Sequence, residues 1–433
     1  MEIEKLTLFN DWWITKKVKE GLLKPYKRPL FNEILRYLDD RQILLVTGLR
    51  RVGKTTLFYQ LIQELVNKGV EPTKILYFSF DEESAEIDDL LKTYREKVLK
   101  AEFENTKIYI FLDEIQKTKD WQNKLKIYYD IYPELKFFIS GSASVSLQKK
   151  AKESLAGRIY DFILLPLSFD EFLDLRGVKV ELEKIEFYRD KILPHFFDYL
   201  RKGGFPEITH EEDDEKIRSY IKNSVIERII YRDLPVEFGL KDIELLNILI
   251  RMIAENPGMI LNYDNLSRDL KRSKTTIINY ISYLEYALIL KLVYNYRKGF
   301  VTSSRKMRKI YLTNVSISFA LVPGFYTEKF LEKAVENLVI NKLNAKNYYR
   351  NNYEIDAVIK TSKGILPVEV KYGKTETKKI LKFLEDFNLK EALVVTKDLF
   401  KKETIDGKKI LFIPAWILLI TPAEKYVGKI TEI

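Results

Sequence analysis

Residues 48–55 read Gly48-Leu49-Arg50-Arg51-Val52-Gly53-Lys54-Thr55. This is the pattern G-x-x-x-x-G-K-[ST], whose glycines allow the backbone to wrap closely around phosphate oxygens. Before it, residues 42–47 form an apolar run typical of a strand buried on both faces; after it, residues 56–65 place apolar side chains at helical spacing. A strand, a glycine loop and a helix in this order predict a phosphate-binding loop rather than a chance match.

The residue types in this loop suit a nucleotide with a metal ion. Backbone N–H groups of the loop and of the helix N-terminus offer donors and partial positive charge. We expect Lys54 to place its charge at the β- and γ-phosphates and Thr55 to ligate Mg²⁺. The predicted cofactors are therefore ATP and Mg²⁺. The predicted nucleotide contacts are Gly48, Leu49, Arg50, Arg51, Val52, Gly53, Lys54, Thr55 and Thr56.

Composition limits the class of protein. The chain has 433 residues, a formal net charge of +10, two histidines and no cysteine. This length favours two to four domains, and the absence of cysteine excludes disulfides and thiolate metal sites. The first residues lack a signal-peptide pattern, and no apolar stretch is long enough for a membrane span. We therefore expect a cytoplasmic protein with no membrane partner.

The pattern downstream of the loop predicts a doubly wound parallel sheet, because apolar runs alternate with helical stretches. The expected further strands are residues 75–80, 108–112, 135–139 and 159–165, and a helix is expected over residues 86–101.

Two carboxylates follow the strand expected at residues 108–112. Because ligands of open α/β sheets bind at the carboxyl ends of the strands, Asp113 and Lys54 should face one crevice. Asp113 fits the Mg²⁺-holding role of a Walker B aspartate, and Glu114 can orient or deprotonate the attacking water. Ser140 ends the next strand and could touch the γ-phosphate or the water, although a turn-capping role suits it nearly as well.

Five motifs together resemble one family. They lie at residues 48–56, 112–116, 140–142, 155–158 and 166–169. In order and spacing they resemble the AAA_14 group of archaeal and bacterial AAA-type ATPases, which is related to AAA+ and STAND NTPases. The resemblance implies a core with a sensor strand between the Walker A and Walker B strands. It also implies that Arg158 contacts the γ-phosphate, in cis or from a neighbouring subunit; an ordinary surface arginine is the alternative.

The next segments are less distinctive. Residues 166–240 have amphipathic helical patterns that suggest a helical lid on the sheet, and residues 211–215 form an acidic run that we read as a solvated helix start.

From residue 242 the pattern changes to helix, short helix, longer helix and hairpin, the order of a winged helix-turn-helix. Residues 268–309 contain 11 Lys or Arg and 2 Asp or Glu, which suits a surface that neutralises phosphates. We therefore expect duplex DNA as a partner through residues 268–309. Winged helices also serve as spacers between domains, which is the alternative. The side chains that could face a major groove are Ser273, Lys274, Thr275, Thr276 and Asn279.

The last segment carries a second constellation. Asp356 is followed after twelve residues by Glu369-Val370-Lys371, and strand alternation puts Glu369 and Lys371 on one face. With Glu336 on a preceding helix they could hold a divalent cation, and Lys371 could stabilise a scissile phosphate. This stretch resembles the DUF4143 and archaeal-ATPase C-terminal domains, which implies a restriction-endonuclease-like PD-(D/E)XK fold. Glu354-Ile355 stands where many such nucleases have proline, so a fold kept for interaction without cutting is the alternative.

The predicted fold is thus α/β, with a P-loop NTPase sheet and helical lid followed by an α+β winged helix and a restriction-endonuclease-like α/β domain. The expected divisions are 1–40, 41–168, 169–240, 241–318 and 319–433. We expect an ATP hydrolase acting on or regulated by DNA. The main alternative is a STAND-like nucleotide switch or scaffold whose C-terminal domain binds a protein partner and has no nuclease activity. Besides DNA, the partners considered are a protein and further copies of the chain in a homo-oligomer. A small-molecule kinase is a weaker alternative, against which the appended modules argue.

Overall fold

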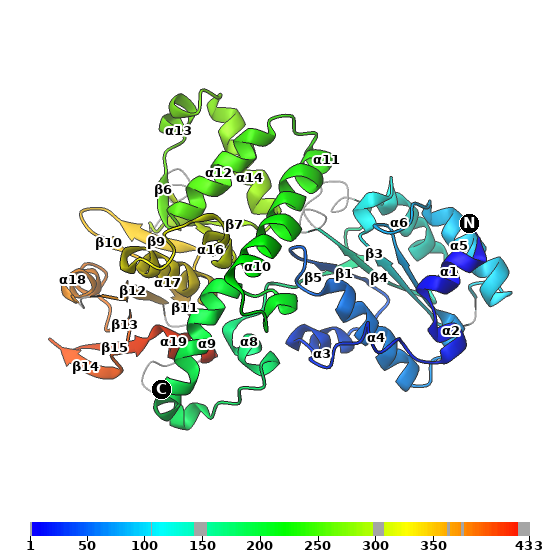
Figure 1. Ribbon diagram of the computed structural model, residues 1–433, viewed down its shortest axis with the longest axis horizontal. Helices are drawn as coiled ribbons and strands as arrows, with labels where there is room; N and C mark the ends of the chain where they lie inside the picture. The colour runs from blue at the N-terminus through cyan, green and yellow to red at the C-terminus, as the bar shows by residue number, and fades with distance from the viewer. Residues whose placement is uncertain are drawn as a thin grey trace. The chain divides into compact units, whose positions relative to one another are not determined.

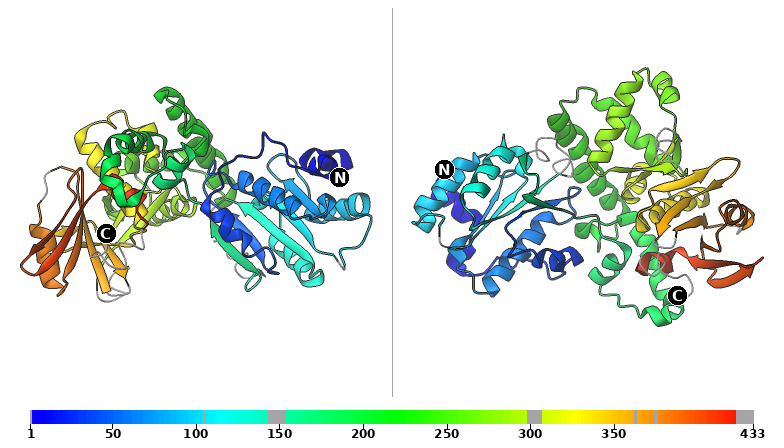
Figure 2. Two further views of the ribbon diagram at one scale, coloured as in Figure 1. Left: turned by 90° about the horizontal axis from the view of Figure 1, so that it is seen from below. Right: turned by 180° about the vertical axis from the view of Figure 1, so that it is seen from behind.

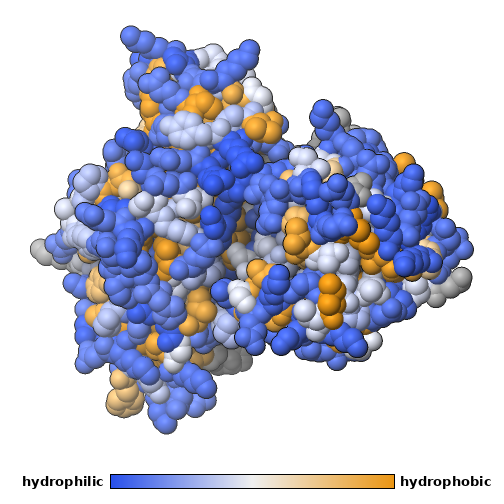
Figure 3. Space-filling model, turned by 45° about the vertical axis from the view of Figure 1, so that its right-hand side comes forward, coloured by the Kyte–Doolittle hydropathy of each residue, from blue (hydrophilic) through white to orange (hydrophobic). Residues whose placement is uncertain are grey.

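The computed structural model describes residues 2–104, 106–142, 154–297, 307–361, 364–373 and 376–422. The chain divides into two compact units, residues 1–165 and residues 166–433. Hydrophobic residues are scattered in small groups among hydrophilic ones on the face drawn in Figure 3. Within the described ranges, no helix combines the length and the apolar character that crossing a membrane requires.

The first unit is built on a sheet of five parallel strands in the order β2-β3-β4-β1-β5. Every residue of β1 to β4 is buried, as the apolar runs predict. Strand β4 lies between β1 and β3, so the sensor strand implied by the family resemblance is confirmed. The strands are β1 Ile43–Thr47, β2 Ile75–Ser79, β3 Ile108–Asp113, β4 Leu135–Gly141 and β5 Ile159–Ile163.

Helices cover both faces of this sheet (Figure 1). Strand alternation sends Phe111 toward α4, where its ring lies 5.3 Å from that of Phe58, while its neighbour Leu112 joins the core under α5 and α6. Trp12 and Trp13 donate their indole N–H groups to the Ile75 carbonyl at 3.1 and 2.8 Å. The helices are α1 Ile3–Phe9, α2 Trp12–Thr15, α3 Pro29–Leu35, α4 Lys54–Asn67, α5 Ile87–Thr93, which continues as a π-helix Tyr94–Leu99, and α6 Trp121–Ile131.

The helices predicted as a lid belong to the second compact unit. There α8 (Phe169–Leu175) packs against α19 (Ala415–Ile420), and α9 (Arg189–Lys202) and α10 (Asp214–Ser219) pack against α16 (Ser316–Leu321). Their packing partners are therefore on the C-terminal side of the chain, and a lid function stays a prediction. Three shorter helical segments continue this layer: π-helices Tyr220–Ile226 and Ile229–Asp233, and α11 Leu234–Phe238.

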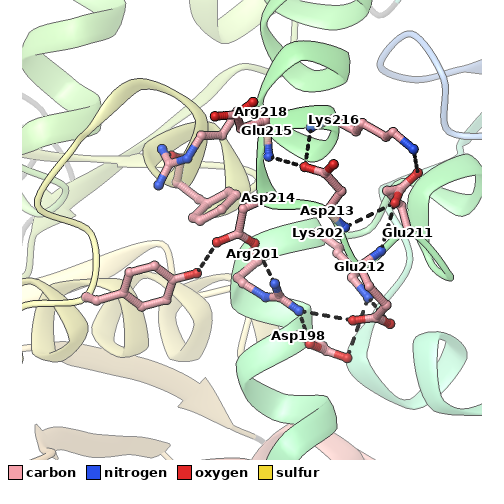
Figure 4. Close-up of polar contacts among 12 residues, drawn as sticks. Asp198, Arg201, Lys202, Glu211, Glu212, Asp213, Asp214, Glu215, Lys216 and Arg218 are labelled. Carbon is pink, nitrogen blue, oxygen red and sulfur yellow. Dashed lines mark hydrogen bonds and ion pairs between the residues drawn. The ribbon is translucent and has the colours of Figure 1, made fainter.

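The acidic run at residues 211–215 begins a helix, as predicted, but it is not simply solvated (Figure 4). Asp213 caps α10 by accepting the N–H groups of the two residues after Asp214. Glu212 instead accepts from Lys202 Nζ at 2.9 Å, and this lysine has no exposed side-chain surface. Glu212 is exposed, as predicted for a solvated run, and it also supplies the carboxylate partner that the buried lysine needs.

The middle of this unit follows the predicted order of helices and hairpin, with one additional short strand. Asn262 caps α13 and Ser273 caps α14 through side-chain oxygens, which fixes both helix starts. The elements are α12 Ile243–Glu255, β6 Met259–Leu261, α13 Tyr263–Asp269, α14 Lys274–Tyr286, β7 Leu290–Asn295 and β8 Arg308–Leu312.

A second sheet runs across the division predicted at residues 318/319. Its order is β10-β9-β7-β8-β6, and β7 pairs in parallel with β9 (Asn347–Arg350). The hairpin and the start of the C-terminal segment therefore share one sheet. The predicted domain divisions stay predictions, and this pairing shows that the last two segments are joined by backbone hydrogen bonds.

The third sheet has the order β11-β12-β13-β15-β14, with β12, β13 and β15 parallel. Strand β11 contacts β9, so the yellow-to-orange strands of the two sheets lie side by side in Figure 2. The remaining elements are α17 Glu328–Lys342, β10 Glu354–Ile355, β11 Ala357–Thr361, β12 Gly364–Lys371, α18 Lys378–Asp386, β13 Glu391–Thr396, β14 Lys401–Ile405 and β15 Lys408–Pro414.

Candidate nucleotide site and C-terminal acidic cluster

The glycine loop joins β1 to α4 in the conformation that a phosphate cradle needs. Gly53 has φ of 99° and caps α4, and Arg51 has φ of 66°. Lys54 is buried, and its Nζ donates to the carbonyl oxygens of Gly48 at 3.2 Å and Leu49 at 3.1 Å. The ammonium group therefore lies across the loop, where phosphate oxygens can replace these carbonyls as its acceptors.

Gly48 is required for a steric reason that the sequence motif does not show. A Cβ added there would lie 2.3 Å from the carbonyl oxygen of Leu164, in the segment that follows β5. Leu164 is held in place because its N–H donates to the Thr47 carbonyl at 2.8 Å.

We expect Gly48→Ala to destabilise the first unit by about 1–3 kcal/mol, because backbone rather than a flexible side chain must move. The melting temperature should fall, and affinity for a fluorescent ATP analogue should fall with it. Gly21→Ala is the matched control, since no atom lies within 4 Å of its added Cβ. Equal melting temperatures for the two variants would contradict the steric argument.

Asp113 is the centre of the polar contacts at the carboxyl end of β3. Its Oδ2 accepts from Thr55 Oγ1 at 2.6 Å and from the Tyr77 hydroxyl at 3.1 Å, and its Oδ1 accepts from Ser140 Oγ. Burial raises the pKa of the Asp113 carboxyl, and the charge of Glu114 raises it further. The buried carboxylate contacts the Thr55 hydroxyl at a helix N-terminus, and these two groups could supply the protein ligands of an Mg²⁺ site. Mg²⁺ needs few protein ligands, because water and phosphate complete its coordination.

Glu114 adopts a left-handed conformation with φ of 54°, which is uncommon for a residue with a side chain. Its Oε1 lies 3.8 Å from Lys54 Nζ, its Oε2 accepts from Gln116 Nε2 at 2.6 Å, and its N–H donates to Ser140 Oγ at 3.2 Å. The predicted residues Lys54, Asp113 and Glu114 are thus gathered in one place with Thr55 and Ser140.

Sequence reasoning missed Tyr77 and Gln116 in this site. Tyr77 lies in β2, and its hydroxyl in a mainly apolar strand was the available signal. Gln116 lies in the turn after Glu114, within the motif at residues 112–116, but the motif did not indicate its contact with Glu114.

The structure does not bring Arg158 to this site. Arg158 precedes β5, and because β5 is parallel to β1, with Ile159 opposite Ile43, it lies at the edge of the sheet away from the glycine loop. A five-residue strand separates the two edges by about 16 Å. The guanidinium pairs with Asp130 through Nε at 2.9 Å and Nη2 at 3.1 Å. Contact with the γ-phosphate in cis is therefore wrong for this structure, and action from a neighbouring subunit stays a prediction.

The predicted C-terminal constellation is gathered around the start of the third sheet. Lys371 Nζ lies 2.6 Å from Glu369 Oε1, and Asp356 Oδ2 accepts the Val370 N–H at 2.8 Å. Burial and the charge of Glu336 raise the pKa of Asp356 to about 6, and burial and the charge of Asp356 raise the pKa of Glu369 to about 7.

The basic segment 268–309 is less exposed than its composition suggests. Lys309, counted as part of the DNA surface, is 4% exposed and pairs with carboxylates of the C-terminal segment. Arg272 pairs with Asp242 at 2.6 Å. The expectation of a wholly solvent-facing basic surface is therefore wrong for Lys309. Ser273, Lys274, Thr275 and Asn279 are exposed and Thr276 is half-buried, while Lys298, Arg305 and Lys306 lie outside the described residues.

Comparisons with known proteins agree with this geometry. A family model described as an AAA domain, AAA_14, matches residues 40–173. Two domains of unknown function follow, DUF8612 over residues 193–327 and DUF4143 over residues 330–416. The fold and the loop thus define an AAA-type P-loop protein.

Relatives extend the match over nearly the whole chain. Uncharacterized protein MJ1544 of Methanocaldococcus jannaschii is 30% identical over 409 residues, 88% of each chain. An uncharacterized protein of Haemophilus influenzae is 24% identical over 417 residues, 89% of this chain and 97% of that one. Among solved structures, the Walker-type ATPase PABY2304 of Pyrococcus abyssi matches 70% of this chain and 97% of its own, with 16% identity and a TM-score of 0.39. The chain belongs to the archaeal and bacterial family of AAA-type P-loop ATPases with a C-terminal DUF4143 region.

Proposed function

We propose that this protein binds ATP with Mg²⁺ and hydrolyses the β–γ bond at the loop of residues 48–55. The observation that carries the proposal is the contact between Thr55 and Asp113 at 2.6 Å beside the buried Lys54, with Glu114 next along the chain. This is the residue set that phosphoryl transfer to water needs. When bound, Mg²⁺ neutralises charge on the β- and γ-phosphate oxygens.

The residues of the chain then have separate roles. Lys54 exchanges its two carbonyl acceptors, Gly48 and Leu49, for phosphate oxygens. Glu114 accepts a proton as the water oxygen bonds to the γ-phosphorus, and the bond from that phosphorus to the bridging oxygen breaks to release ADP and phosphate. Tyr77 and Ser140 donate to Asp113 and hold its carboxylate in position.

The test compares wild type with Lys54→Ala in two assays, binding of a fluorescent ATP analogue and Mg²⁺-dependent release of phosphate. We expect wild type to bind and hydrolyse, and the variant to lose at least tenfold in affinity together with its turnover, because an ammonium–phosphate contact is worth more than about 1.4 kcal/mol. Turnover unchanged in Lys54→Ala would sink the proposal.

A second candidate function is coupling of the ATPase to duplex DNA. We infer that residues 243–312 form a winged helix, supported by the order α12, β6, α13, α14, β7 and β8. The N-terminal turn of α14 exposes Ser273, Lys274 and Thr275, the place from which a recognition helix contacts base edges.

Filter binding to a duplex at two salt concentrations tests this coupling. We expect affinity to fall steeply between about 50 and about 200 mM salt and to fall further in Lys274→Glu. Lys360→Glu, an exposed lysine on β11, is the matched control. Absence of salt-dependent binding would favour the other interpretation, a nucleotide switch whose C-terminal segment binds a protein or another copy of the chain.

A further inference from the structure

Lys309 of β8 lies inside the acidic cluster of the C-terminal segment. Its side chain is 5% exposed, and its Nζ is 2.7 Å from Glu354 Oε1, 3.2 Å from Glu336 Oε1 and 3.8 Å from Asp356 Oδ1. Burial alone would lower the pKa of Lys309, but the charges of Glu336, Asp356 and Glu354 outweigh burial and raise it. The lysine is therefore charged and surrounded by oxygens.

The carboxylates of this cluster have further donors besides Lys309. The Tyr311 hydroxyl donates to Glu336 Oε1 at 2.5 Å, and Arg350 Nη1 lies 3.4 Å from Glu354 Oε2. Lys371 pairs with Glu369, whose Oε2 is the one buried carboxylate oxygen of the cluster that lacks a hydrogen-bond partner among the described residues.

These contacts test whether a divalent metal ion fits, as the resemblance to PD-(D/E)XK nucleases implies. Such an ion needs two or more protein oxygens that converge on one point without a cation between them, and water or phosphate supplies its other ligands. Here an ammonium group stands between Glu336 and Asp356, and Glu369 is held by a second lysine. Within the described ranges, no group of three or more Asp, Glu, His or Cys is arranged to hold a metal. The donor set does not fit a divalent ion.

The charge balance supports the same conclusion. Four carboxylates, of Glu336, Glu354, Asp356 and Glu369, face three cationic groups, of Lys309, Arg350 and Lys371. With every group ionised the cluster carries a net charge of −1. A divalent ion would reverse this to +1 in a partly buried site, which is costly unless a cation leaves.

We propose that the ammonium group of Lys309 is the resident cation of this cluster, so that the cluster binds no divalent metal ion and does not cut phosphodiester bonds. Its role is to hold two sheets together. Lys309 belongs to the second sheet, and Asp356 lies where the chain passes from β10 of that sheet to β11 of the third. The same ion pairs tie α17, through Glu336, to β8.

The experiment is a titration of the full chain with Mn²⁺ in the absence of nucleotide, with free Mn²⁺ read by electron paramagnetic resonance. Every protein carries Asp113→Asn, which removes the carboxylate that contacts Thr55 in the nucleotide site. We expect this background protein and its Asp356→Asn derivative to bind the same amount of Mn²⁺. Lys309→Met should gain one Mn²⁺ per chain, and adding Asp356→Asn should remove that gain. Lys291→Met, on the neighbouring strand β7, should gain none, because its Nζ donates to Asn344 at 3.0 Å rather than to a carboxylate.

Two results would overturn the proposal. One is Mn²⁺ binding in the background protein that Asp356→Asn or Glu369→Gln abolishes. The other is a folded Lys309→Met that gains no Mn²⁺, because the lysine would then not be what excludes the metal. If Lys309→Met fails to fold, the comparison of the background protein with its Asp356→Asn and Glu369→Gln derivatives decides alone: equal Mn²⁺ binding supports the proposal and a loss overturns it.

Discussion

Glu114→Gln should lower the rate of ATP hydrolysis by about 100-fold or more while leaving ATP bound, because positioned general bases contribute about 10²–10⁴-fold. Glutamine keeps the size of the side chain and an oxygen that can accept a hydrogen bond from Gln116. In the wild-type chain, Gln116 Nε2 donates to Glu114 Oε2 at 2.6 Å. It cannot accept a proton from the attacking water. Single-turnover hydrolysis and binding of a fluorescent ATP analogue, measured on the same preparation, separate the two effects.

A carboxylate at the opposite edge of the same sheet provides the control. Glu134 is exposed and immediately precedes β4, whereas the nucleotide loop lies at the carboxyl ends of the strands. Glu134→Gln should leave both binding and hydrolysis unchanged. If Glu114→Gln hydrolysed ATP within a few-fold of the wild-type rate, another group would have to activate the water. The remaining role of Glu114 would then be electrostatic, through its carboxylate 3.8 Å from Lys54 Nζ.

The nucleotide site was predictable from sequence because its signals are local. The loop sequence determines which residues surround a phosphate, and the parallel sheet places Asp113 beside it, since both follow the carboxyl ends of their strands. Thr55 and Asp113 are 58 positions apart in the sequence. Two apolar runs and the doubly wound pattern were nevertheless enough to predict that they lie close together. Tyr77 was missed because tyrosine is common in strands, so its presence in the strand did not indicate a polar contact.

Arg158 and Lys309 show where sequence reasoning fails. The family resemblance implied a role for Arg158 but did not show at which end of the sheet it lies. One strand length separates Arg158 from the glycine loop. Lys309 was one of 11 basic residues in a segment of 42, so composition placed it on a surface. Its burial depends on the pairing of β7 with β9, which brings β8 next to α17 and the β10–β11 corner. No periodicity within either segment encodes that pairing.

For the C-terminal segment, the presence of a nuclease-like residue pattern does not by itself imply nuclease activity. The Asp356, Glu369 and Lys371 pattern is present and the side chains do gather, but a neighbouring strand supplies a cation to the same carboxylates. A motif match could not reveal this, because Lys309 lies 47 positions before Asp356 and in a different sheet from Glu369 and Lys371. Under the proposal for Lys309, the role of the C-terminal segment is binding rather than cutting.

Lys309→Met should destabilise the second unit by about 3 kcal/mol. This is the lower end of the cost of breaking a buried ion pair, and we choose it because Glu336 and Glu354 are partly exposed. Methionine keeps the apolar stem but leaves three carboxylates facing one another. Hydrogen exchange of peptides covering β8 and α17 reads this unit separately, and their exchange should become about 100-fold faster.

The matched change Lys291→Met should be neutral or slightly stabilising. Burial lowers the pKa of Lys291 to about 8, so its charge is unfavourable in the folded state and its removal relieves that cost. The two lysines lie on adjacent strands of one sheet, and the two variants are expected to change stability in opposite directions. Carboxylates face Lys309, whereas burial and the charge of Lys346 act against the charge of Lys291. If both variants exchanged alike, the ion pairs of Lys309 would contribute no net stability, and its burial would reflect packing of its stem alone.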